Sequence, residues 1–276
     1  MSIQKILVPV DFSDCSKNAV HSAIKLAAAF QAELTILHAF QIPTVSGEAG
    51  GAMVVQELSQ EAEYEAKGAM NELIADFPSL KHIKFKKQII HSFPHEAIEN
   101  SIEHNHYDLV IMGTKGSSGL EEKLIGSNTY SVIKSSAIPV LALPEDKNIH
   151  ELEDIAFAGD YQKIEDREIF DVLLELCNFY NSTIHILHVT ESREKITADE
   201  AFEARKFKQY FKNVQHNYHL IQNDDIEAGI YEYIDTHPIH LLAMVPRKHN
   251  VFDRIFKESL TKKIACHARV PFLALT

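Results

Sequence analysis

The sequence contains little cysteine, has no excess of basic residues and lacks long hydrophobic runs. Its three cysteines, Cys15, Cys177 and Cys266, lie far apart and form no CxxC pair, which argues against a disulfide framework and indicates a reducing compartment. A formal charge of -12 argues against general binding to nucleic acids or anionic membranes. No stretch approaches a membrane span, and the N-terminus lacks the apolar core of a signal peptide. We therefore expect a cytoplasmic protein.

The sequence also lacks the motifs of common metal sites and of hydrolases. Four of its histidines fall within residues 91–106, but no HExxH motif and no paired Cys/His spacing accompanies them. Ser117 and Ser118 stand outside any G-x-S-x-G motif. We therefore predict neither a metal site nor catalytic residues.

A glycine-rich stretch, residues 108–128, carries the clearest chemical signal. An apolar strand is expected to end at Gly113, and further glycines follow before Gly126, Ser127 and a predicted helix over 130–135. Glycine reaches positive φ and lets main-chain N–H groups approach a bulky anion, and the N-terminus of a helix favours phosphate. The stretch fits neither the Walker A motif nor G-x-G-x-x-G. It therefore predicts a phosphate-binding loop of another kind.

Apolar runs alternate with amphipathic helical patterns along the first half of the chain. Strands are predicted at residues 5–10, 34–40, 84–90, 109–112 and 139–143, and helices at 15–30, 54–76, 94–105 and 130–135. This alternation implies right-handed crossovers and a mainly parallel sheet. Residues 41–53, rich in glycine, are expected to form a flexible loop.

The second half of the chain repeats this pattern. Four later segments resemble earlier strands: 155–160 resembles 6–11, 186–189 resembles 36–39, 241–244 resembles 109–112, and 270–275 resembles 138–143. The first two pairs are separated by 149 and 150 residues, and the last two pairs by 132 residues. The second copy is therefore about seventeen residues shorter and lacks most of the loop over 41–58. We therefore predict two domains, 1–146 and 147–276, with a charged linker over 144–153.

The glycine-rich stretch resembles one known family. Gly113, Gly116, Gly126 and Ser127 fill, in order, the pattern G-x2-G-x9-G-(S/T) of the ATP-binding branch of the universal stress protein family. The resemblance covers nearly the whole chain twice. It implies two tandem α/β domains, each a mainly parallel, five-stranded, doubly wound (Rossmann-like) sheet. They are expected to pack as a pseudo-two-fold pair through their last strands.

The resemblance also implies a ligand, ATP with Mg2+, in the first domain. Asp11, after the first strand, would lie near the base, and Ala39, after the second-strand histidine, would line the pocket where valine is commoner in the family. Residue type and position alone leave open that Asp11 caps a helix. Lys115 either assists the phosphates or is solvated.

The ligand motif occurs only once. In the second copy Val245, Lys248 and Glu258 replace the three glycines, while Ser259 and Asp160 are kept. Valine resists positive φ and a carboxylate repels phosphate, so we expect one ATP per chain and a structural or regulatory second domain. The alternative is that residues 247–249 bind a different anion. We also expect that Gly113→Val abolishes ATP binding with little loss of fold.

Three functions remain open from the sequence. The first is an ATP-responsive stress or signalling module, in which the nucleotide orders the loops around it and changes a surface that faces a partner protein. The second is a slow ATPase or phosphotransferase. The third is a nucleotide-independent scaffold. Binding is favoured over turnover because no general base is evident in the glycine loop. An intramolecular pseudo-dimer is expected, and further self-association is left open.

Overall fold

The computed structural model describes residues 3–42, 52–115, 126–159, 167–190, 205–245 and 270–276. The first half contains β1 (Lys5–Pro9), α1 (Asp14–Phe30), β2 (Glu33–Phe40), α2 (Ala52–Asp76), the 3-10 helix η1 (Pro78–His82), β3 (Phe85–His91), α3 (Pro94–Asn105), β4 (Leu109–Gly113), α4 (Ser127–Ser135) and β5 (Val140–Leu143). The second half contains β6 (Asp154–Ala158), the 3-10 helix η2 (Arg167–Phe170), α5 (Asp171–Tyr180), β7 (Thr183–Thr190), β8 (Gln215–Gln222), α7 (Ile226–Thr236), β9 (Leu241–Met244) and β10 (Phe272–Ala274).

The predicted strands and helices of the first half are all present, with ends that shift by a few residues. The largest shift is at α4, which was predicted to begin at residue 130 and begins at Ser127. Ser127 therefore belongs to the first helical turn instead of preceding the helix. The predicted loop over 41–53 lies mostly outside the described residues.

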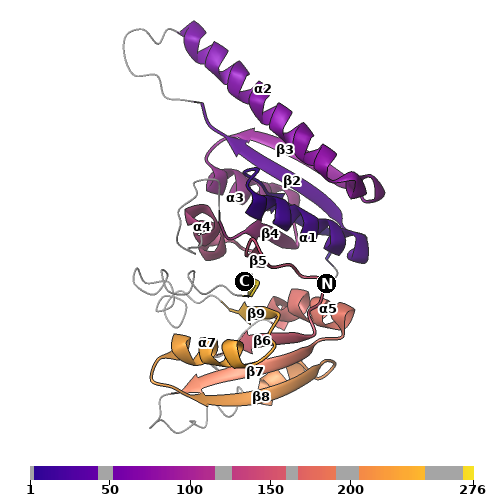
Figure 1. Cartoon of the computed structure of the whole chain (residues 1–276), viewed down its shortest axis with the longest axis vertical. Helices are drawn as coiled ribbons and strands as arrows, with labels where there is room; N and C mark the ends of the chain where they lie inside the picture. The colour runs from indigo at the N-terminus through magenta and orange to yellow at the C-terminus, as the bar shows by residue number, and fades with distance from the viewer. Residues whose placement is uncertain (1–2, 43–51, 116–125, 160–166, 191–204, 246–269) are drawn as a thin grey trace.

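The strands form one ten-stranded sheet in the order β3-β2-β1-β4-β5-β10-β9-β6-β7-β8. Neighbouring strands are parallel except β5 and β10, which pair antiparallel with Leu273 opposite Leu141. Figure 1 shows β5 between the two halves, with the C-terminus beside it. The predicted fold, two doubly wound sheets paired through their last strands, is confirmed.

The central strands of each half are buried on both faces of the sheet, as continuous apolar strands predict. Along β1, Ile6 and Val8 contribute to one hydrophobic cluster and Leu7 contributes to the other. The side chains of β4 and β5 are all buried. Burying one such aliphatic side chain stabilises the fold by about 1.5–3 kcal/mol, so these central strands fix the frame that holds the loops.

The halves also meet beside the central strands. Glu175 Oε2, on α5, accepts a hydrogen bond of 2.7 Å from the N–H of Ile3. Phe30 is the last residue of α1 and Phe179 the last but one of α5, and their ring centroids lie 5.3 Å apart. Contact between the same ends of corresponding helices is what a pseudo-two-fold axis produces.

A fragment of residues 1–146 is expected to dimerise. It would leave β5 without β10, and an apolar unpaired edge favours antiparallel pairing with another copy. Sedimentation velocity would detect the dimer, and a synthetic peptide of residues 270–276 should compete with it for that edge. A strictly monomeric fragment would contradict this prediction.

Candidate functional site

The pocket lies where the strand order of the first half reverses. From β1 the chain passes to β2 on one side, whereas β4 pairs with the other side of β1, so the carboxyl ends of β1 and β4 leave a crevice. Residues at the carboxyl ends of β1, β2 and β4 and at the beginnings of α1, α3 and α4 line it: Pro9, Val10, Asp11, Ser16, Leu37, Ala39, Pro94, Ile98, Met112, Gly113, Lys115, Gly126, Ser127, Asn128 and Thr129.

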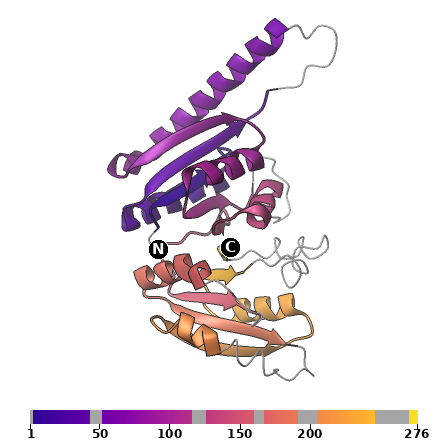
Figure 2. The ribbon, with the colours of Figure 1, turned by 180° about the vertical axis from the view of Figure 1, so that it is seen from behind.

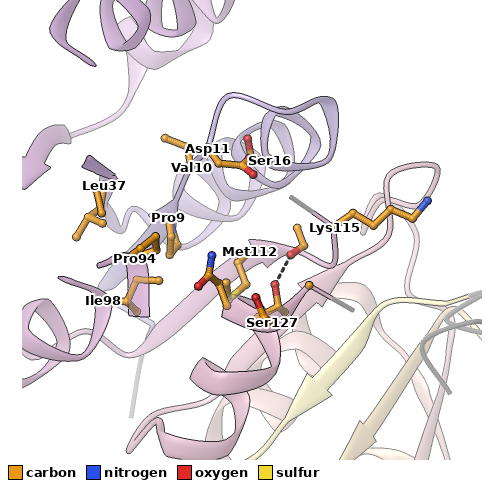
Figure 3. Close-up of a pocket in the computed structure, with 15 residues that line it drawn as sticks. Pro9, Val10, Asp11, Ser16, Leu37, Pro94, Ile98, Met112, Lys115 and Ser127 are labelled. Atoms are coloured by element: carbon orange, nitrogen blue, oxygen red, sulfur yellow. Dashed lines mark hydrogen bonds between the residues drawn. The ribbon is translucent and has the colours of Figure 1, made fainter. Parts of the chain in front are cut away.

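Five of the six predicted site residues line this one pocket: Asp11, Ala39, Gly113, Gly126 and Ser127. The sixth, Gly116, lies outside the described residues. Figure 3 shows an apolar side that includes Leu37 and Ile98, with Asp11 and Ser127 on other sides of the space. The arrangement offers an apolar wall at one end and a helix N-terminus at the other.

Asp11 does not itself cap α1. The cap is Ser13, whose side chain accepts a hydrogen bond from the N–H of Ser16. The backbone N–H and the hydroxyl of Ser13 in turn donate to Asp11 Oδ1 at 3.2 and 2.6 Å. Asp11 thus braces the capping serine while its carboxylate lines the pocket.

The turn that carries Asp11 has an unusual backbone. Phe12 has a φ of 65°, a left-handed conformation that is uncommon for residues other than glycine. Its ring packs on His38 at a centroid distance of 4.3 Å, and His38 Nδ1 lies 2.8 Å from the carbonyl oxygen of Val10. These contacts hold the chain on both sides of Asp11, so the position of its carboxylate is fixed by the fold.

The second half keeps the same histidine contact. His188 Nδ1 lies 3.3 Å from the carbonyl oxygen of Gly159, at the end of the equivalent first strand. The repeat therefore extends to a tertiary hydrogen bond, and this histidine serves the fold in both halves.

Two hydrogen bonds close the base of the glycine-rich loop. The N–H of Gly126 donates to the carbonyl oxygen of Thr114 at 2.6 Å, and the hydroxyl of Thr129 donates to the carbonyl oxygen of Gly113 at 2.8 Å. Together they tie the first turn of α4 to the end of β4. The role of Thr129 was missed from the sequence, because the family pattern ends at the preceding residues.

The first turn of α4 carries main-chain and hydroxyl groups of the pocket that suit an anion. The N–H groups of a helix's first turn have no carbonyl partner one turn earlier, and the positive end of the helix dipole lies there. Ser127 and Asn128 are exposed at this turn, whereas Thr129 is buried. The turn can therefore present main-chain donors and the Ser127 hydroxyl to a phosphate group.

The reason for glycine differs from the expected one at both described positions. Gly126 has a φ of -60°, which any residue can adopt. A Cβ added at Gly113 would lie 2.8 Å from Cys15 Sγ and 2.9 Å from the backbone carbonyl carbon of Cys15. Gly113 is thus required where α1 packs against β4, so the expectation that Gly113→Val spares the fold is wrong.

Cys15 itself is a buried structural thiol. Its Sγ donates to the carbonyl oxygen of Leu143 at 3.3 Å and accepts from the N–H of Lys115 at 3.5 Å. Burial raises the pKa of the Cys15 thiol, which disfavours the reactive thiolate. The side chain of Lys115 extends away from Asp11 and Ser127 in Figure 3, consistent with a solvated lysine.

Comparison with known proteins identifies the family. Residues 2–144 match the model of the Universal stress protein family. The chain belongs to this family. A universal stress protein of Methanocaldococcus jannaschii is 32% identical over 146 residues, which cover 52% of this chain and 84% of the relative. The Bacillus subtilis universal stress protein YxiE is 30% identical over 142 residues, covering 50% and 96%.

The likeness of folds extends over both halves. The crystal structure of a universal stress protein from Archaeoglobus fulgidus matches with a TM-score of 0.71 and 17% identity. The match covers 100% of this chain and 99% of that one. At this identity the likeness shows the fold alone.

The second half of this universal stress protein differs from the first at the position of Gly113. Val245 stands at the position equivalent to Gly113, is half-buried and packs against the larger hydrophobic cluster. The described helical segment after β6 begins at Arg167, further from its strand than α1 is from β1. The other compared positions, Asp160, Lys248, Glu258 and Ser259, lie outside the described residues, as do residues 247–249.

No metal site is evident in the described parts of this universal stress protein. Within residues 3–42, 52–115, 126–159, 167–190, 205–245 and 270–276, no three His, Cys, Asp or Glu side chains are grouped to hold an ion. The same ranges contain no helix long and apolar enough to cross a membrane.

Proposed function

We propose that the pocket of the first half binds ATP with Mg2+, and that the protein acts in the cytoplasm as an ATP-dependent stress-response or signalling module. The main support is the pocket at the β1/β4 reversal, which combines an apolar wall with the N-terminus of α4. Nucleotides need both surfaces, because the base is flat and largely apolar while the phosphates are anionic.

The nucleoside end of the ligand would lie on the β1 and β2 side of the pocket. Leu37, Ala39 and Ile98 supply apolar contacts there. Asp11, fixed beside them by Ser13, can accept hydrogen bonds from N–H or O–H groups of the nucleoside. These residues would select a nucleotide over free phosphate.

The phosphate end would lie at the glycine-rich loop. Main-chain N–H groups around Gly113, Gly116 and Gly126, with the Ser127 hydroxyl, are proposed to bind the phosphate oxygens. Mg2+, when bound with the nucleotide, would offset part of the phosphate charge. We assign this site to a domain over 1–146 and regard 147–276 as its degenerate copy, with a structural or regulatory role.

Calorimetric titration of the full chain with ATP and Mg2+ tests the proposal. We expect saturable binding of ATP that inorganic triphosphate does not reproduce, because triphosphate lacks the group that contacts the apolar wall. Mass spectrometry of small molecules released from freshly purified, denatured protein should show an adenine nucleotide. A protein that is purified empty and does not bind ATP at millimolar concentration would instead be a nucleotide-independent scaffold.

Phosphate release separates a binding module from a slow ATPase or phosphotransferase. In the described part of the pocket, the carboxylate of Asp11 accepts two hydrogen bonds from Ser13, an arrangement suited to holding a ligand. We expect little turnover in burst and steady-state measurements with Mg2+. Sustained phosphate release by the wild type, absent in a variant that no longer binds ATP, would show that the protein is an enzyme.

A further inference from the structure

The strand β8 forms one outer edge of the ten-stranded sheet. It is the last strand in the sheet order, and its sequence, QHNYHLIQ, has eight residues without a lysine, arginine, aspartate, glutamate or proline. Figures 1 and 2 show it at the far end of the second half from opposite sides. Tyr218 and Leu220 are 42% and 54% exposed on it. A long, neutral edge with exposed apolar side chains is a template for pairing with another strand.

The opposite edge of the sheet is protected. There β3 carries Lys86 and Lys87, and charged side chains on an edge discourage pairing. Lys86 Nζ lies 2.7 Å from Glu33 Oε1, and Lys87 Nζ donates to Asn71 on α2 at 2.7 Å. β3 and β8 occupy equivalent places in the two halves, but β3 is a charged edge and β8 is a neutral one.

We propose that β8 pairs antiparallel with β8 of a second copy of this chain and forms a two-fold dimer. Charge favours a second copy here, because two chains of formal charge -12 repel each other over most of their surfaces but meet at β8 without a formal charge. The fold already closes an equivalent kind of edge in this way, since β5 and β10 of its own two halves pair antiparallel. This proposal is independent of the nucleotide site.

The side chains of β8 suit such a pair. Directly opposed residues of an antiparallel pair lie on the same face of the sheet. A two-fold axis at the middle of β8 would place Tyr218 opposite either Leu220 or Tyr218 of the second copy. Each arrangement covers the exposed apolar side chains of the edge, and aromatic pairs of this kind stabilise antiparallel strands.

The dimer is expected to be weak. Pairing along one edge buries less surface than a standard protein interface, as in many transient complexes, and we expect association in the micromolar range. Sedimentation velocity of the full chain across that range should show a concentration-dependent species of twice the chain mass. Hydrogen exchange should slow in β8 as concentration rises, and not in β3.

Leu220→Lys is the decisive variant. It places a lysine of each copy in the paired edge, in place of an exposed apolar side chain, and we expect dimerisation to weaken about tenfold or more. Tyr64→Lys is the matched control: Tyr64 is a 79% exposed side chain on α2, so this variant adds the same charge away from β8 and should leave association unchanged. Circular dichroism melting checks that both variants fold.

Three outcomes would overturn the proposal. The first is a wild-type chain that stays monomeric throughout the micromolar range, which would leave β8 to a strand of another protein. The second is a dimer that Leu220→Lys does not weaken. The third is a dimer in which hydrogen exchange slows at β3 or α2 instead of β8.

Discussion

Alanine at Gly113 is expected to destabilise the whole first half of the protein. The added Cβ would lie 2.8 Å from Cys15 Sγ, 2.9 Å from the Cys15 carbonyl carbon and 3.0 Å from its oxygen. Contacts this short force α1 away from β4, and overpacking of this kind costs about 1–3 kcal/mol of the free energy of unfolding. Urea denaturation followed by circular dichroism would measure it. The larger valine should cost more.

Removing the thiol should not rescue the variant. Cys15→Ala eliminates the contact with Sγ, but the carbonyl carbon and oxygen of residue 15 belong to the backbone of α1 and remain. The double variant Gly113→Ala with Cys15→Ala should therefore stay less stable than Cys15→Ala alone. Equal stability of these two would show that only the side chain limits the space at Gly113.

Gly68→Ala is the matched control for this substitution. Gly68 lies within α2 on the exposed side, and a Cβ there meets nothing within 4 Å. Alanine is the better helix former by about 0.5–1 kcal/mol, so this variant should be more stable than the wild type. If Gly113→Ala lowers the free energy of unfolding and Gly68→Ala raises it, the effect at Gly113 comes from packing and not from backbone entropy. A loss of stability in both would contradict the packing explanation.

The contrast between these glycines shows what the sequence could predict and what it could not. The pattern marked Gly113 as a special position, and the structure places it at the end of β4. Its packing reason depends on Cys15, which is distant in sequence and adjacent only after folding. A local sequence pattern cannot predict a contact between residues that are far apart in the sequence. The left-handed Phe12 escaped prediction similarly, because its packing on His38 is a tertiary contact.

The strands that are buried on both faces were the easiest to predict from the sequence. Residues 109–112 read LVIM, an unbroken apolar run, and they form the fully buried β4. β8, with the sequence QHNYHLIQ, is an exposed edge strand whose few apolar side chains give a weak signal, and it was not predicted. The repeat itself was found because its central strands kept their apolar sequence in both halves.

Gly126→Glu is expected to weaken ATP binding about a hundredfold without unfolding the protein. The substitution gives the first half the glutamate that stands at residue 258 in the second. Gly126 has a φ of -60° and a ψ of 149°, so its backbone conformation suits glutamate as well as glycine. The variant therefore tests the phosphate site in a way that Gly113→Val, which crowds Cys15, does not.

The expected loss follows from charge. Two unit charges about 5 Å apart at an effective dielectric constant of about 20 repel by about 3 kcal/mol. That energy corresponds to a loss of affinity of about a hundredfold. Gly126→Gln adds a side chain of nearly the same size without the charge, so it should bind ATP more tightly than Gly126→Glu. Calorimetry would compare the ATP affinities of the two variants. Equal affinities would mean that the size of the side chain or a change in the backbone, and not the charge, weakens ATP binding.

The same titration measures how many nucleotides the chain binds. If the glycines control binding, the wild type should fit one ATP per chain, because the second half has Val245, Lys248 and Glu258 in their places. Gly126→Glu should then weaken the single binding event and leave no ATP bound with wild-type affinity. Two equivalent sites in the wild type, or one ATP bound with wild-type affinity in Gly126→Glu, would show that the second half retains a site. The difference between the halves at these glycines would then not determine where the nucleotide binds.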